Sequence, residues 1–225
     1  KYFSSKKVIC IDDKYYKSLI NKKYRITDKN LKNSNKDDYL SLMYTSGTTG
    51  KPKGVVRDHK SYYNLAAITS IELSIKKTDN ALLVMPLCHA NSFNFFYSYI
   101  FAGASVYVYS KKSFESKYFF NTIKKHKCSF TSLVPTHFII LLEYLKKSNT
   151  KNIISHKFNF MISSAPARVD TKKEILYFFK SANLYELYGS SESGWVTMLH
   201  PEEQFSNLGT VGRECVGSKN IKILN

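Results

Sequence analysis

The chain has 225 residues, of which 43% are hydrophobic and 15% aromatic, and its formal net charge is +17. This composition excludes a disordered chain and allows one substantial domain with a buried core. The longest apolar tract, residues 93–109, is interrupted by polar residues and a glycine, so it does not provide the about 20 apolar residues that a membrane span needs.

The strong positive charge raises the question of nucleic-acid binding. Lysines are spread along most of the chain, often beside Asn, Tyr, Ile and Phe, and they do not form one stripe. No zinc-finger or RRM signature accompanies them. We therefore interpret the charge as general lysine usage that favours acidic ligands, and keep a basic nucleic-acid-binding protein only as a distant alternative.

The cysteine pattern indicates the redox compartment. Cys10, Cys88, Cys128 and Cys215 lie far apart in the sequence and form no CxxC pair. This spacing is typical of free thiols in a reducing compartment. No N-terminal apolar run followed by a small-residue cleavage site is visible. Together these features predict a cytoplasmic protein.

The predicted elements alternate between strands and helices. Residues 1–38 are rich in Lys and Asn, which predicts a connecting arm. Short apolar runs then predict strands at 41–45, 54–58, 81–86, 105–110, 129–134, 158–164 and 184–189. Helical periodicity predicts helices at 61–73, 115–127, 135–147 and 171–180, with 93–101 as either a buried helix or a hydrophobic wall. This order predicts an α/β domain with a largely parallel β-sheet flanked by helices.

Three of these strands run directly into polar loops. SLMYT is followed by SGTTG, FNFMISS by APA, and LYELYG by SSESG. In parallel sheets, ligands usually bind at the carboxyl ends of the strands. The pattern predicts that these loops contribute to one binding site.

The first of these loops, within YTSGTTGKPKGVV (44–56), has the composition of a polyphosphate-binding loop. Its glycines let backbone N–H groups approach an anion, while hydroxyls and lysines add hydrogen bonds and charge. It is not a Walker motif, because its glycine spacing differs and Pro52 follows Lys51. Pro52 favours a turn between two strands. A flexible hairpin turn without a ligand is the simpler alternative.

The same stretch resembles the phosphate-binding loop of the adenylate-forming (AMP-binding) superfamily, which includes acyl-CoA synthetases, luciferases and peptide-synthetase adenylation domains. Later segments resemble further motifs of that family in the same order: MPLCHAN (85–91), ISSAPA (162–167), ELYGSSES (186–193) and LGTVGRECVGSKNIKIL (208–224). Cys88, Ser164 and Ser191 replace the family's usual aromatic, glycine and threonine. The chain is most similar to an acyl-CoA synthetase.

This resemblance implies that a carboxylic acid reacts with ATP to give an acyl-adenylate, and that coenzyme A then takes the acyl group. It implies roles for Glu192 as the Mg²⁺ ligand, Ser191 at the α-phosphate, Lys53 at the outer phosphates, and His89 at the mouth of the acyl pocket. A histidine with a purely local hydrogen bond after a strand is the alternative for His89. The implied nucleotide contacts are Thr45, Ser46, Gly47, Thr48, Thr49, Gly50, Lys53, Ser164, Ala165, Pro166, Glu186, Leu187, Tyr188, Gly189, Ser190 and Ser191. Tyr188 would stack on adenine, with Ser164–Pro166 on the other side of the base.

The resemblance also sets expectations for the extent and specificity of the chain. Residues 39–225 are expected to be a partial ATP/AMP-binding domain, the central part of the family's large N-terminal domain. The upstream region and the small C-terminal domain are absent, so little turnover is expected from this segment alone. HANSFNFFYSYIFAGA (89–104) suits an apolar acid, or else forms buried core. An adenylation domain and a noncatalytic nucleotide-binding relative remain as alternatives.

Overall fold

The computed structural model describes residues 35–45, 51–151, 153–218 and 221–222. The chain divides into two units, Lys1–Asp38 and Tyr39–Asn225, and the fold given below is that of the second unit. The predicted connecting arm lies almost entirely outside the described residues, and so do the loop residues Ser46, Gly47, Thr48, Thr49 and Gly50.

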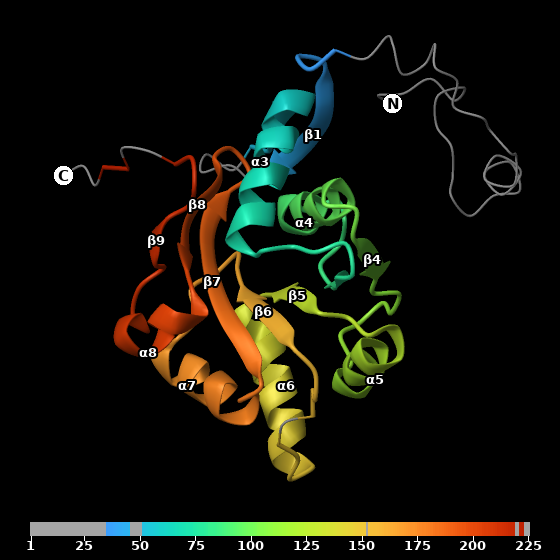
Figure 1. Cartoon of the computed structure of the whole chain (residues 1–225), viewed down its shortest axis with the longest axis vertical. Helices are drawn as coiled ribbons and strands as arrows, with labels where there is room; N and C mark the ends of the chain where they lie inside the picture. Colours follow the sequence, from blue (N-terminus) through green and yellow to red (C-terminus); the bar gives the residue numbers. More distant parts are fainter. Residues whose placement is uncertain (1–34, 46–50, 152, 219–220, 223–225) are drawn as a thin grey trace, which may run out of the picture. The chain divides into compact units, whose positions relative to one another are not determined.

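A seven-stranded sheet forms the centre of the unit (Figure 1). In sheet order its strands are β4 (Ser105–Val108), β3 (Asn80–Leu83), β5 (Phe130–Leu133), β6 (Phe158–Ile162), β7 (Ala182–Ser190), β8 (Gly194–Leu199) and β9 (Arg213–Glu214). All pairs from β4 to β7 are parallel, whereas β7–β8 and β8–β9 are antiparallel. The predicted largely parallel sheet is confirmed. The sequence patterns did not predict the two antiparallel strands.

The strands on either side of the glycine loop form a separate sheet. β1 (Tyr39–Thr45) and β2 (Lys53–Asp58) pair antiparallel, with Thr45 opposite Lys53 at the loop end. Among the described strands β1 pairs only with β2. The prediction that the glycine loop follows a strand of the parallel sheet is therefore wrong, while the predicted turn between two strands agrees with this pairing.

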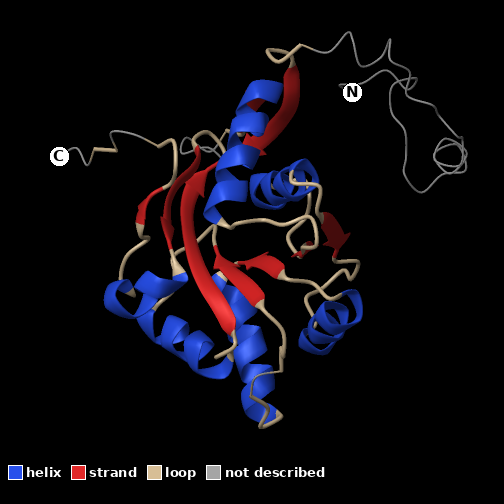
Figure 2. Cartoon of the chain, in the orientation of Figure 1, coloured by secondary structure: helices blue, strands red, loops and turns tan. Residues whose placement is uncertain are grey.

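Helices cover both faces of the large sheet (Figure 2). They are α3 (His59–Glu72), α4 (Ala90–Phe101), α5 (Ser116–His126), α6 (Pro135–Lys147), α7 (Val169–Phe178) and α8 (Gln204–Asn207), with a 3₁₀ turn η2 (Pro201–Glu203). One apolar cluster joins one face of the sheet to α5, α6 and α7, and a second joins the other face to α3 and α4. Residues 93–101 thus belong to a buried helix, one of the two alternatives left open by the sequence.

Side-chain alternation along the inner strands assigns each residue to one face. On β6, Phe160 packs into the α5–α7 cluster and Met161 into the α3–α4 cluster. On β7, Leu184 packs into the α5–α7 cluster and Tyr185 into the α3–α4 cluster. Glu186 lies two residues after Leu184, so its side chain is on the face of the sheet that α7 covers. This placement determines its partner, which is described below.

The helices begin within three residues of the predicted starts. α3 begins after Asp58, whose carboxylate accepts a hydrogen bond from the Ser61 N–H at 2.7 Å, and this bond lowers the pKa of Asp58. The spacing of Thr171 and Glu174 is that of a capping box, which predicts a start of α7 near residue 171. Instead it begins at Val169 without a side-chain cap, and Glu174 accepts a hydrogen bond from Lys146 at 2.7 Å.

Candidate active site

Two adjoining cavities lie at the carboxyl ends of β6 and β7. The first, which we call the Tyr188 cavity, has a volume of about 440 Å³ and is lined by Ser164–Pro166, Glu186–Gly189 and Val211. The second, which we call the His89 cavity, has a volume of about 390 Å³. Ser164, Leu187 and Gly189 line both. The predicted meeting of the loops after β6 and β7 is therefore present, at the sheet edge where α/β proteins bind ligands.

The Tyr188 cavity has the lining that a flat apolar ligand needs. The Tyr188 side chain is 56% exposed although it lies on an inner strand, so its ring is available for stacking. Ala165, Pro166 and Val211 supply further apolar surface. The sequence-predicted residues of this part of the site thus lie together, in an arrangement that fits a planar base.

Glu186 borders the same cavity, but its carboxylate already has partners. It is 2% exposed, forms an ion pair with Lys172, and accepts a hydrogen bond from the Ala167 N–H at 3.3 Å. The Lys172 ammonium also donates to the Thr210 carbonyl at 3.4 Å. These contacts join β7 to α7, to the loop after β6 and to the segment before Val211. We therefore propose that Glu186 positions the cavity walls, in place of the direct nucleotide contact implied by the family resemblance.

The His89 cavity is formed mainly by α4 and by the loops after β6 and β7. His89 precedes α4 and is exposed, and its side chain takes no part in capping that helix. Its imidazole forms no hydrogen bond or ion pair with any described residue. The alternative of a locally hydrogen-bonded histidine thus finds no support within the described part of the chain.

The β7–β8 turn presents Ser191 and Glu192. The Ser190 and Ser193 hydroxyls lie 3.0 Å apart, and the Ser193 N–H donates to the Ser190 oxygen at 3.0 Å. The Ser190 hydroxyl is therefore engaged in holding the turn. Ser191 lines the His89 cavity. The Glu192 carboxylate is exposed and has no partner among the described residues.

Gly189 is required at this turn by the backbone. A Cβ atom added there would lie 2.2 Å from the Gly194 carbonyl oxygen, because the two strands of the hairpin approach closely. Any larger residue would force the β7–β8 strands apart. The close backbone approach is thus a sufficient reason for glycine, without a ligand contact.

The described residues contain no ready-made metal centre. Among them, no cluster of three or more His, Cys, Asp or Glu side chains is arranged to hold a metal ion. A single carboxylate such as Glu192 nevertheless suits Mg²⁺, which commonly binds one or two carboxylates together with substrate phosphates. The free oxygen ligands of Glu192 fit that mode. No helix in the described ranges is both long and apolar enough to cross a membrane.

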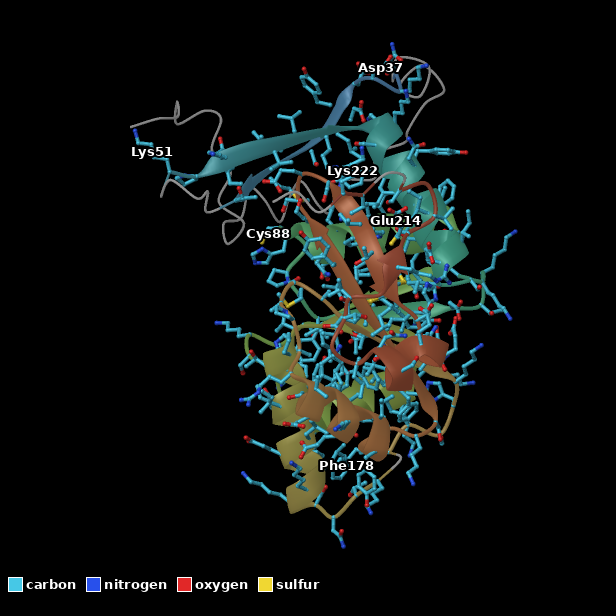
Figure 3. The ribbon with its side chains drawn as sticks, turned by 90° about the vertical axis from the view of Figure 1, so that its left-hand side faces the viewer. Asp37, Lys51, Cys88, Phe178, Glu214 and Lys222 are labelled. Carbon is cyan, nitrogen blue, oxygen red and sulfur yellow. The ribbon has the colours of Figure 1, made fainter. Side chains whose placement is uncertain are left out.

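Lys53 lies at the loop end of the β1–β2 hairpin and is exposed. Figure 3 shows Lys51 at the outer end of this hairpin, and Cys88 lies on the same side of the view. Thr45 and Lys53, which flank the glycine loop, thus lie opposite each other at the same end of the hairpin.

Two residues near the cavities were not identified from the sequence. Arg57 on β2 lies beside the β7–β8 turn, since a Cβ on Gly194 would be 3.1 Å from its guanidinium. Asn94 on α4 borders the His89 cavity. For Asn94, the available signal is an amide within an aromatic-rich helix, five residues after His89.

Ser164 has an unusual backbone conformation. Its φ is +67°, in the left-handed region that favours glycine, and it lines both cavities. This is the position at which the resembled family usually has glycine, and the structure gives a backbone reason for that preference. The strained loop holds Ser164 between the two cavities.

We expect Ser164→Gly to raise the free energy of unfolding by about 1 kcal/mol, because a left-handed conformation costs an L-residue about 1–2 kcal/mol and glycine very little. Urea unfolding measures this change. The control is Ala165→Gly, since φ of Ala165 is negative; it is expected to lose about 0.5–1 kcal/mol from the greater entropy of the unfolded chain. Equal losses in both variants would contradict the strain assigned to Ser164.

Comparison with known proteins identifies a family. The sequence profile of the family described as AMP-binding enzyme matches residues 3–225, a range that includes most of the stretch interpreted as a connecting arm. The 2-succinylbenzoate–CoA ligase of Bacillus subtilis is 28% identical over 178 residues, which cover 79% of this chain and 35% of the relative. The 4-hydroxybutyrate–CoA ligase 2 of Metallosphaera sedula is 29% identical, covering 68% of this chain and 28% of the relative.

Solved structures agree on the fold. O-succinylbenzoate coenzyme A synthetase from Bacillus subtilis, in complex with ATP and magnesium ion, matches with a TM-score of 0.71 and 25% identity, over 85% of this chain and 40% of that one. The N-terminal domain of FACL13 from Mycobacterium tuberculosis matches with a TM-score of 0.70 and 24% identity, over 80% and 44%, which shows the fold alone. The chain spans about a third of the length of the curated relatives that it matches.

Proposed function

The chain belongs to the AMP-binding enzyme family, and we propose that the whole protein activates a carboxylic acid with ATP and then transfers the acyl group to coenzyme A. One observation carries this proposal: the Tyr188 and His89 cavities share Ser164, Leu187 and Gly189. A nucleotide base in the first cavity therefore leaves its α-phosphate near the second, where an acid can approach it. The names of the similar ligases support coenzyme A as the acceptor.

In the first step, a carboxylate oxygen attacks the α-phosphorus of ATP, the bond to the bridging oxygen breaks, and pyrophosphate leaves. Tyr188 would stack on the base, and the Ser191 hydroxyl would donate a hydrogen bond to the α-phosphate. His89, whose imidazole has no partner among the described residues, would orient the acid carboxylate. In the second step, the thiolate sulfur of coenzyme A attacks the acyl carbon, and AMP leaves.

Charge neutralisation is the main electrostatic requirement of the first step. Lys53 and the hydroxyls and backbone N–H groups of the Thr45–Gly50 loop would hold the outer phosphates, and Glu192 would bind Mg²⁺. The bound Mg²⁺ supplies positive charge that offsets the charge on the leaving pyrophosphate. The net charge of +17 favours the approach of all three anionic substrates. Because ATP and coenzyme A are the proposed substrates, we propose a cytoplasmic location.

We expect the whole protein to exchange labelled pyrophosphate into ATP only when a suitable carboxylic acid and Mg²⁺ are both present. Exchange reports the reversible first step and does not depend on the identity of the thiol acceptor. Mass spectrometry of the products with coenzyme A then tests the second step. A protein that binds Mg-ATP, with about 2.7 kcal/mol of added stability at 100 times its Kd, but exchanges with no acid would support the noncatalytic alternative.

A further inference from the structure

Asn94 is a buried amide without a partner in the described part of the chain. It lies on α4, is 1% exposed and borders the His89 cavity. Neither its side-chain oxygen nor its side-chain nitrogen forms a hydrogen bond with a described residue. Buried polar groups in folded proteins are nearly always paired, because an unpaired one loses its bonds to water without replacement. The amide therefore lacks the partner that its burial calls for, at a position that borders the His89 cavity.

Several buried polar side chains near Asn94 are paired, whereas both polar atoms of its amide lack a partner among the described residues. The Ser98 hydroxyl, one turn further along α4, donates to the Asn94 backbone carbonyl at 2.7 Å. Ser132 and Ser163 share a hydrogen bond of 2.7 Å, and the Asn91 amide nitrogen donates to the Ser163 hydroxyl at 2.8 Å. The Asn91 side-chain oxygen, also buried, has no partner among the described residues. Three unpaired amide atoms, on Asn91 and Asn94, thus lie on α4 beside the His89 cavity.

The aromatic residues of α4 do not line the His89 cavity, whose walls combine polar side chains with Met85, Leu187 and Trp195. The Phe95 ring lies 4.8 Å from that of Phe130 and 5.1 Å from that of Trp195, measured between centroids. Tyr99 lies 5.2 Å from Phe130. The expectation that this aromatic-rich stretch forms a pocket for an apolar acid is thus not supported, and these rings belong to the buried core, the other reading of the sequence.

We propose that the acid activated by this protein carries a hydrogen-bonding group, such as a hydroxyl, carbonyl or amide, which pairs with Asn94 in the His89 cavity. This inference rests on the proposed function, and it makes Asn94 a determinant of substrate specificity. The amide offers both a donor and an acceptor, so it suits a group with either property. An acid with a purely alkyl tail would leave the amide buried and unpaired. Sites built to bond a substrate hydroxyl discriminate strongly against the analogue that lacks it.

The test compares acids that differ only in that group. Straight-chain acids of two to eight carbons and their ω-hydroxy counterparts, with benzoate and 4-hydroxybenzoate, are assayed by pyrophosphate exchange with the whole protein. In the pair that reacts best, we expect the hydroxy acid to have at least a ~10-fold higher kcat/KM. Asn94→Leu is a near-isosteric change. In this variant, kcat/KM for the hydroxy acid should fall by about 10-fold or more, while kcat/KM for the acid without the hydroxyl should stay the same or rise.

The matched control is Ser98→Ala, which lies on the same helix and is buried but does not line the cavity. It should leave the ratio of the two kcat/KM values within the pair unchanged. A second readout needs no substrate: Asn94→Leu should be at least as stable as the parent chain, since it removes an unpaired buried amide. A loss of stability would point to a structural partner, such as a fixed water, and would overturn the proposal.

The outcomes separate this inference from the function on which it rests. Exchange that favours the alkyl acids, or a Leu variant that lowers both members of a pair equally, overturns the role of Asn94 and leaves the adenylation proposal standing. Exchange with no acid in the panel counts against the proposed function itself. If the Leu variant does not fold, the ratio of kcat/KM values for the hydroxy and alkyl acids in the parent protein still tests the proposal.

Discussion

Replacing Glu192 by glutamine is expected to lower acid-dependent pyrophosphate exchange by about 10²–10³-fold, the loss that follows removal of one preorganised electrostatic contact at a reacting centre. Glutamine keeps the size of the side chain and one oxygen but removes the charge that attracts Mg²⁺. Because Glu192 is exposed and has no partner among the described residues, the change should leave the fold intact. Exchange rates are measured across a Mg²⁺ titration, with ATP saturating.

The matched control for this variant is Glu143→Gln, at an exposed position on α6 outside both cavities. It removes the same charge from the chain, so it separates a local effect from a change in net charge. We expect its exchange rate and Mg²⁺ dependence to be those of the parent protein. If the two variants behaved alike, the metal-binding role of Glu192 would be excluded.

The alternation of strands and helices was predictable because apolar periodicity records which side chains face the core. SFTSLV, FNFMISS and LYELYG all form strands of the parallel sheet, and their order gives the position of the ligand edge. The same reasoning predicts that Ser164–Pro166 and Tyr188 lie close together, and in the structure they line one cavity. Local patterns sufficed here because each residue's role follows from its place on a strand or in the loop after it.

The features that were missed depend on contacts between distant segments. The separate β1–β2 sheet has the same strand pattern as the parallel strands, and only its pairing distinguishes it. Gly189 is required by the approach of Gly194 across a hairpin, a distance that no motif encodes. The direction of Asn94 depends on which side of α4 packs against Phe130 and Trp195. Sequence order therefore predicted which segments meet at the two cavities, but not the contacts that shape them.

Glu186 and Lys172 form the other contact that the sequence did not indicate. They are 2% and 1% exposed, respectively. Two buried charges are costly to remove from water, and their mutual attraction offsets that cost only while both are present. Because the pair also includes the Ala167 N–H and the Thr210 carbonyl, it connects three segments that line the Tyr188 cavity. The stability of the domain and the shape of the Tyr188 cavity are thus coupled through one ion pair.

Replacing Lys172 by methionine is expected to lower the free energy of unfolding by about 3–5 kcal/mol, because it leaves the Glu186 carboxylate buried without its counter-charge. Methionine retains much of the apolar stem, so lost packing contributes little. The double variant Lys172→Met with Glu186→Gln should recover most of the loss, since the amide is neutral and still accepts a hydrogen bond from Ala167. Urea unfolding of the parent, both single variants and the double variant completes the cycle.

The control is Lys173→Met, one residue along α7 and exposed, which should change the free energy of unfolding by no more than about 0.5 kcal/mol. ATP affinity provides a further discrimination. The double variant regains stability but not the contact between Lys172 and the Thr210 carbonyl, so its Kd for ATP should stay above that of the parent. A double variant with both stability and affinity restored would show that Lys172 acts only by neutralising Glu186. If the single variant lost no stability, the buried pair would not hold these segments together.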